Sequence, residues 1–81
     1  PLEAEKQLME KVKIGDRTGA REVLNMILAS IMLRDPGNVA VLKARMLELL
    51  SILGRSAVEG GVDINFILDV YQGSRYIFLK T

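Results

Sequence analysis

Residues 43–61 read KARMLELLSILGRSAVEGG, and they decide which fold the chain can adopt. Nearly all of these residues favour a helix and most are apolar, up to the glycine pair Gly60 and Gly61 that ends the stretch. Four charged side chains nevertheless lie within it: Arg45, Glu48, Arg55 and Glu59. A predicted core helix that carries four charges raises the question of where those charges point.

The four charges form one charged stripe on the predicted helix. Positions 45, 48, 52, 55 and 59 follow one another by steps of three and four residues, so they share one side of a helix. The signs alternate, so Arg45 can pair with Glu48 and Arg55 with Glu59. If the stripe faces solvent, such pairs contribute about 0–1 kcal/mol to stability. If it is partly buried, the stripe would fix how helices or subunits dock. A ligand or nucleic-acid role for the arginines is the third interpretation.

Apolar residues surround most of this helix, which we predict over residues 39–58. Asn38 precedes it as a candidate N-cap, and Gly60 lies near its C-cap. A helix that is apolar on most sides is normally buried on most sides. We therefore expect the third helix to be the central element of the fold. The residues concerned are Val39, Val41, Leu42, Met46, Leu47, Leu49, Leu50, Ile52 and Leu53.

Turn signals divide the rest of the chain into three more helices. The break at residues 35–38, with the sequence DPGN, is strong, and Gly15 with Asp16 forms a softer one. Helical spacing of apolar residues predicts helices over 2–14, 17–33 and 63–72, with Asp16 and Asp63 as N-caps.

Each of these helices has a distinct pattern. In the first, Leu8, Met9 and Val12 form the apolar face, and the charged residues, Glu5 among them, are assigned to the other face. In the second, the apolar face is Ala20, Val23, Leu24, Ile27, Leu28 and Ile31. After Gly73 the tail RYIFLKT is rich in β-formers, so the fourth helix is predicted only through Gln72. Short connections favour a compact all-α bundle of four mostly antiparallel helices.

Composition excludes several classes of function. The 81 residues form one domain, 1–81, with no cysteine, no histidine and a net charge of +1. Zinc sites and Cys- or His-based catalysis lack their residues, and no Gly-rich phosphate loop is present, so we expect no enzyme, metal or cofactor. The basic excess typical of DNA-binding modules is missing. No apolar run reaches the length of a membrane span, so we expect that the chain neither spans nor binds a membrane.

The apolar content of the chain is high for its size. Hydrophobic residues make up 49% of the sequence, and the mean hydropathy is +0.23. Surface-to-volume scaling leaves much of a small domain exposed. Either the core is unusually dense or a partner covers an apolar face. The chain also begins at Pro1 without methionine, so we expect a piece of a longer protein.

Residues 42–70, LKARMLELLSILGRSAVEGGVDINFILDV, resemble a segment of AraC-type bacterial transcription regulators that is associated with a PocR-type sensory domain. The matching residues there are Lys43, Arg45, Glu48, Leu49, Arg55, Ala57, Glu59, Gly60, Gly61 and Asp63. Upstream, the stretch KVKIGDRTGAREVLNMIL is similar at Gly15, Asp16, Ala20, Arg21, Leu24, Asn25 and Leu28. The resemblance covers roughly residues 5–71. It departs at Gly54 and Ser56, where the family more often has Ser and Ala.

The resemblance implies a helical linker or dimerisation module of a cytoplasmic transcription regulator. Such a module would relay the state of a sensor to a DNA-binding domain with two helix-turn-helix motifs, both outside this chain. Its expected partners are a second copy and the sensor and DNA-binding domains of the same protein, with DNA contacted only through the latter. Two alternatives stay open: direct DNA binding at the turns 35–38 or 60–63, and a ligand pocket lined by Met9, Met26, Met32 and Met46.

Overall fold

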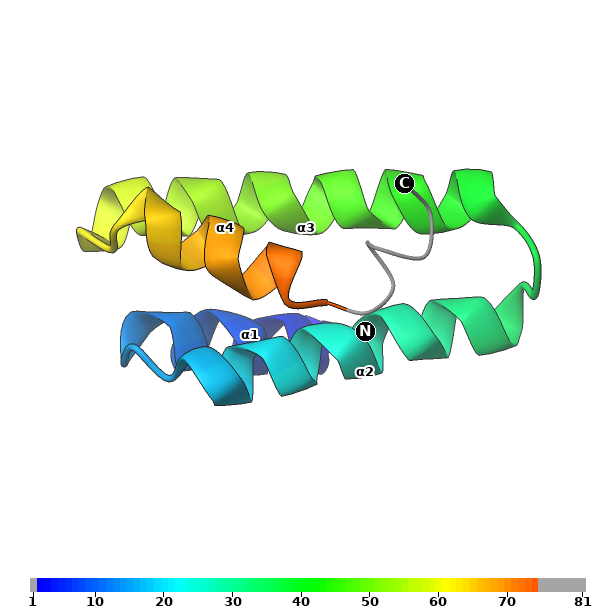
Figure 1. Ribbon diagram of the computed structural model, residues 1–81, viewed down its shortest axis with the longest axis horizontal. Helices are drawn as coiled ribbons and strands as arrows, with labels where there is room; N and C mark the ends of the chain where they lie inside the picture. Colours follow the sequence, from blue (N-terminus) through cyan, green and yellow to red (C-terminus); the bar gives the residue numbers. More distant parts are fainter. Residues whose placement is uncertain (1, 75–81) are drawn as a thin grey trace.

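Four helices joined by short turns make up the chain (Figure 1). The structure is a computed structural model that describes residues 2–74, without the side chain of Leu2, so the predictions for the tail RYIFLKT fall outside it. Successive helices run antiparallel, and the predicted all-α bundle is confirmed. The helices are α1 (Leu2–Lys13), α2 (Arg17–Arg34), α3 (Val39–Gly60) and α4 (Ile64–Gln72).

The helices begin where the sequence places their caps. Side-chain oxygens of Asp16, Asn38 and Asp63 accept hydrogen bonds from backbone N–H groups two or three residues later, at 2.9, 3.1 and 2.9 Å. Each bond satisfies one of the free donors at a helix N-terminus. At the other end of α3, Gly61 adopts a left-handed φ of 71°, and its N–H bonds to the carbonyl of Ala57. This conformation favours glycine and turns the chain towards α4.

The two long helices, α2 and α3, form a hairpin that carries the two short ones. In Figure 1, α4 lies in front of this hairpin and α1 behind it, both on the half away from the α2–α3 turn. α1 packs mainly on α2, and α3 contacts each of the other three helices. None of the helices within residues 2–74 is both long enough and apolar enough to span a membrane.

The core lies between the hairpin and the short helices. All six residues of the apolar face predicted for α2 are buried, and they form the largest group in the core. The other helices contribute Leu8 and Val12 from α1, Leu42, Leu49, Leu53 and Ala57 from α3, and Ile67, Val70 and Tyr71 from α4.

One expectation about α3 is wrong, because this helix is not buried on most sides. It has four buried residues along its 22-residue length, whereas the 18-residue α2 has six. Leu47 is 67% exposed and Val58 is 83% exposed. The reason is geometric: α3 contacts all three other helices, as a central helix does, but it forms one edge of the molecule (Figure 1), so its opposite side stays open.

This asymmetry predicts that the same substitution, Leu to Ala, destabilises the protein at a buried position of α3 and has little effect at an exposed one. Leu49 is 1% exposed, so Leu49→Ala should lower the free energy of unfolding by about 2–5 kcal/mol. Leu47→Ala removes the same atoms from an exposed position and should change it by no more than about 0.5 kcal/mol. Urea denaturation followed by circular dichroism measures both. Equal losses would mean that α3 is buried on both sides.

Candidate docking site

Arg45 joins two helices and is the best-held member of the charged stripe. Its Nη1 donates to Glu48 Oε1 at 2.6 Å, as the spacing predicted, and its Nη2 donates to Glu5 Oε2 of α1 at 3.0 Å. The side chains of Arg45 and Glu5 are 30% and 18% exposed. The hydrogen bonds with Glu48 and then Glu5 raise the pKa of Arg45 above its usual value. At this position the stripe is partly buried and docks α3 onto α1.

The partner of Arg45 was not predicted, because the sequence pattern led us to place Glu5 on the outer face of the first helix. That assignment is wrong, since Glu5 reaches inward to α3. The signal was present: Glu5 stands three residues before Leu8 and seven before Val12, so it continues the buried face of α1. A carboxylate at the end of an apolar stripe is well placed to meet a cation on the neighbouring helix.

The second half of the stripe faces solvent. Arg55 and Glu59 are exposed, and within residues 2–74 no ion pair joins them, contrary to the spacing argument. Gly60, the last residue of α3, and Gly61, its C-cap, are exposed in the turn that follows. The two structural interpretations of the stripe therefore each apply to one half: Arg45 is a docking residue, whereas Arg55 and Glu59 lie on a solvated edge.

Beside the stripe runs an exposed face of α3 without any charge. We call it the outward face, and it consists of Ala40, Ala44, Leu47, Ser51, Gly54 and Val58. Steps of four and three residues place these positions on one side of the helix. All are exposed except Gly54, which is half-buried, and a Cβ added at Gly54 would meet no atom within 4 Å.

This outward face is unusual for a helix edge in water. The solvent side of a surface helix normally carries charged and polar residues, whereas here it offers small side chains and two exposed large apolar ones. Its middle is shallowly hollowed, between Ala44, Leu47 and Ser51 and the stripe residues Glu48 and Arg55. Contiguous exposed apolar surface marks sites of interaction. The outward face was not predicted, because the apolar residues around α3 were interpreted as evidence that the helix is buried.

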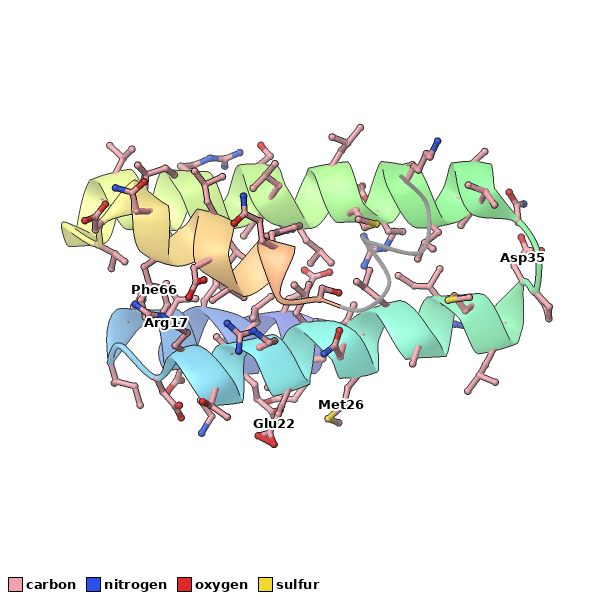
Figure 2. All side chains as sticks on the ribbon, viewed as in Figure 1. Arg17, Glu22, Met26, Asp35 and Phe66 are labelled. Carbon is pink, nitrogen blue, oxygen red and sulfur yellow. The ribbon has the colours of Figure 1, made fainter. Side chains whose placement is uncertain are left out.

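A second polar cluster, also missed, fixes α4 on α2. Asp69 forms ion pairs with Arg17 at 2.9 Å and with Arg21 at 3.5 Å. The guanidinium of Arg17 also lies 5.3 Å from the ring centre of Phe66, a cation–π contact between α2 and α4 (Figure 2). Gly73 leaves room for Arg21, because a Cβ there would overlap the guanidinium. A larger residue at position 73, the C-cap of α4, would therefore require the Arg21 side chain to move.

Two further hydrogen bonds hold the end of α4. The buried Tyr71 hydroxyl donates to the backbone carbonyl of Met46 on α3 at 3.0 Å. Ser74 is fully buried, and its hydroxyl donates to Asn25 Oδ1 on α2 at 2.9 Å. Burial raises the pKa of Tyr71 above its ordinary value. α4 is therefore tied to both long helices just before the end of the described residues.

The four methionines do not gather into one pocket. Met32 lines a small hollow of about 20 Å³ near the α2–α3 turn, together with Ile31, Val39 and Leu42. Met26, by contrast, is 67% exposed and points away from the bundle (Figure 2). Ligand pockets of drug-sized molecules are typically about 300–1,000 Å³. No group of three or more His, Cys, Asp or Glu side chains able to hold a metal occurs within residues 2–74.

The Glu5–Arg45 pair predicts an energetic coupling that the exposed half of the stripe lacks. A double-mutant cycle with Glu5→Gln and Arg45→Gln should give a coupling energy of about 1 kcal/mol, the upper end for pairs that reach solvent. The matched cycle with Arg55→Gln and Glu59→Gln should give about 0.3 kcal/mol or less. Both come from urea denaturation. A larger coupling in the second cycle would contradict the docking role of Arg45.

The raised pKa of Tyr71 predicts a pH dependence. An unfolded tyrosine titrates near pH 10, so the stability contributed by the neutral buried hydroxyl is fully present below that value. It is lost as the pH rises above about 10, towards the raised pKa of the folded state. Tyr71→Phe should lower the free energy of unfolding by about 1 kcal/mol at neutral pH and flatten its decline in alkali. Parallel declines in both proteins would exclude this role.

Comparison with known proteins adds no family assignment: no family model matches the chain, and neither a curated protein nor a solved structure matches it.

Proposed function

We propose that the chain is a helical linker and dimerisation module of a bacterial transcription regulator. It would relay the state of a sensor to a DNA-binding domain, both outside these 81 residues, and it would act in the cytoplasm without catalysis or a cofactor. The observation that carries the proposal is the uncharged outward face of α3, on the same helix whose partly buried Arg45 binds α1. This combination offers one surface to a partner and ties the same helix to α1.

The contacts of α3 suggest how a signal would cross the module. Two adjacent residues hold the two short helices: Arg45 binds Glu5 of α1, and the carbonyl of Met46 binds Tyr71 of α4. A shift of α1 that moves Glu5 would also move Arg45. The same turn of α3 contains Met46, whose carbonyl accepts the hydrogen bond from Tyr71 of α4. Packed side chains and hydrogen bonds of this kind are the physical means by which two sites influence each other. In this proposal α1 receives the signal and α4 passes it on.

Direct DNA binding is less well supported by the same contacts. Phosphate recognition needs free lysine and arginine side chains on one surface. Arg17 and Arg21 are engaged by Asp69, and Arg45 is engaged by Glu5 and Glu48. The turn at residues 35–38 presents an Asp35 carboxylate, which accepts from Asn38 at 2.9 Å.

The ligand-binding alternative likewise lacks a supporting observation. The hollow near the α2–α3 turn has a volume of about 20 Å³, and of the four methionines only Met32 is among the residues that line it. A helical relay module uses the outward face of α3, which a ligand-binding bundle leaves unexplained.

The proposal predicts that breaking the Glu5–Arg45 contact weakens the response of the regulator that contains this segment. A loss of about 0.5–1 kcal/mol of coupling corresponds to about a two- to fivefold smaller change in reporter expression on adding the sensed ligand. Glu5→Gln should show this loss, whereas DNA binding measured by gel shift stays unchanged.

The control for this experiment is Arg55→Gln, which alters the exposed half of the charged stripe and should leave the response intact. Two results would overturn the proposal: a full response of Glu5→Gln, and a flanking sequence that encodes an enzyme domain where a DNA-binding domain is expected.

A further inference from the structure

We propose that the outward face of α3 docks onto the same face of a second copy, with the two α3 helices antiparallel about a two-fold axis near Leu49. This inference rests on the proposed function, since it names the partner and the surface of the dimerisation step. Three properties of the outward face support this pairing: the order of its residues, the charges beside the face and the area of the face.

The outward face has the same spacing when it is followed from either end. Its six positions are separated by steps of 4, 3, 4, 3 and 4 residues, which is a palindrome. An antiparallel copy therefore meets it in register, in three kinds of layer. Ala40 faces the partner's Val58, Ala44 faces the partner's Gly54, and Leu47 faces the partner's Ser51.

These layers match large side chains with small ones. The two exposed large residues of the face, Leu47 and Val58, each lie opposite a small residue, and Ala44 lies opposite a glycine. Small residues allow two helices to approach closely, and interdigitation of large with small gives dense packing. A parallel pair would instead set Leu47 against the partner's Leu47 and leave Gly54 facing the partner's Gly54. The sequence of the face therefore favours the antiparallel arrangement.

On the side of the charged stripe, the charges beside the face are complementary in the same arrangement. Helical side chains lean towards the N-terminus of their own helix. In an antiparallel pair, Arg55 thus leans towards the axis, where the partner's Glu48 leans to meet it, and symmetry repeats the contact. The two Glu48 carboxylates lie near the axis, and each is already bound by Arg45 of its own chain at 2.6 Å. This gives exposed Arg55, which has no ion pair within residues 2–74, a partner.

The described fold leaves the approach open. α3 forms the upper edge of the molecule in Figure 1, and α1, α2 and α4 all lie on its other side. α3 has 22 residues. A helix of that length is about 33 Å long, and a contact strip roughly 12 Å wide along it covers on the order of 400 Å². A standard stable interface buries about 800 Å² per partner, so the dimer should be weak and reversible, with a dissociation constant in the micromolar range or above.

Sedimentation equilibrium of the full chain from micromolar to millimolar concentration tests this pairing. The protein should show a reversible monomer–dimer equilibrium. Leu47→Glu should raise the dissociation constant by about tenfold or more, because it places a charge in a central layer. The control is Met26→Glu on α2, because Met26 and Leu47 are both 67% exposed. That variant should dimerise like the parent chain, and a strictly monomeric parent chain, or a dimer indifferent to Leu47→Glu, overturns the inference.

Cross-linking tests the orientation, and the absence of native cysteine makes the result unambiguous. A mixture of Ala40→Cys and Val58→Cys chains should form a disulfide-linked heterodimer. Ala40→Cys alone should not, because in the antiparallel pair the two thiols are about 27 Å apart along the axis, far beyond the reach of a disulfide. Efficient cross-linking of Ala40→Cys alone would overturn the antiparallel arrangement. These outcomes are independent of the Glu5→Gln reporter response, so a monomeric chain with a working relay would refute this inference and the dimerisation part of the proposed function but not the relay.

Discussion

One turn of α3, at Arg45 and Met46, gives each of the two short helices a polar contact with α3, in addition to their packing on α2. α1 has 12 residues and α4 has nine. Isolated helices of this length are marginal in water and need tertiary contacts to persist. Arg45 supplies a charged hydrogen bond to Glu5 of α1, and the carbonyl of Met46 accepts from Tyr71 of α4. The hairpin of α2 and α3 carries both short helices, and this turn of α3 adds one polar contact to each of them.

The same arrangement explains why α3 has an open side. α1, α2 and α4 all contact α3, and Figure 1 shows them on one side of it. The opposite side consequently has no neighbour within the described residues, although it carries Leu47 and Val58. The 49% hydrophobic content is thus divided between a real core and exposed apolar positions.

Local signals in the sequence predicted the fold well, whereas contacts between helices were out of their reach. The caps at Asp16, Asn38 and Asp63 and the apolar spacing of α2 depend on neighbours within a few residues, so the pattern contains them. Burial of α3 depends on where the other helices lie, and a helix apolar all round does not say which side is covered. The Arg45–Glu48 pair was predictable because it is local, but the pair with Glu5 spans 40 residues. The proximity of Gly73 to the Arg21 side chain is likewise a tertiary contact that the local pattern does not contain.

A weak docking face suits a relay better than a strong one. A ligand shifts a conformational equilibrium only by its difference in affinity for the two states, and couplings of about 1–3 kcal/mol are typical. The coupling of about 1 kcal/mol expected for the Glu5–Arg45 pair lies in that range, so a sensor could shift it. A large, fully apolar interface would hold its partner regardless of the signal. In a longer regulator, contacts elsewhere would raise the effective concentration of the two α3 helices, and pairing would then respond to small movements of α1 through Glu5 and Arg45.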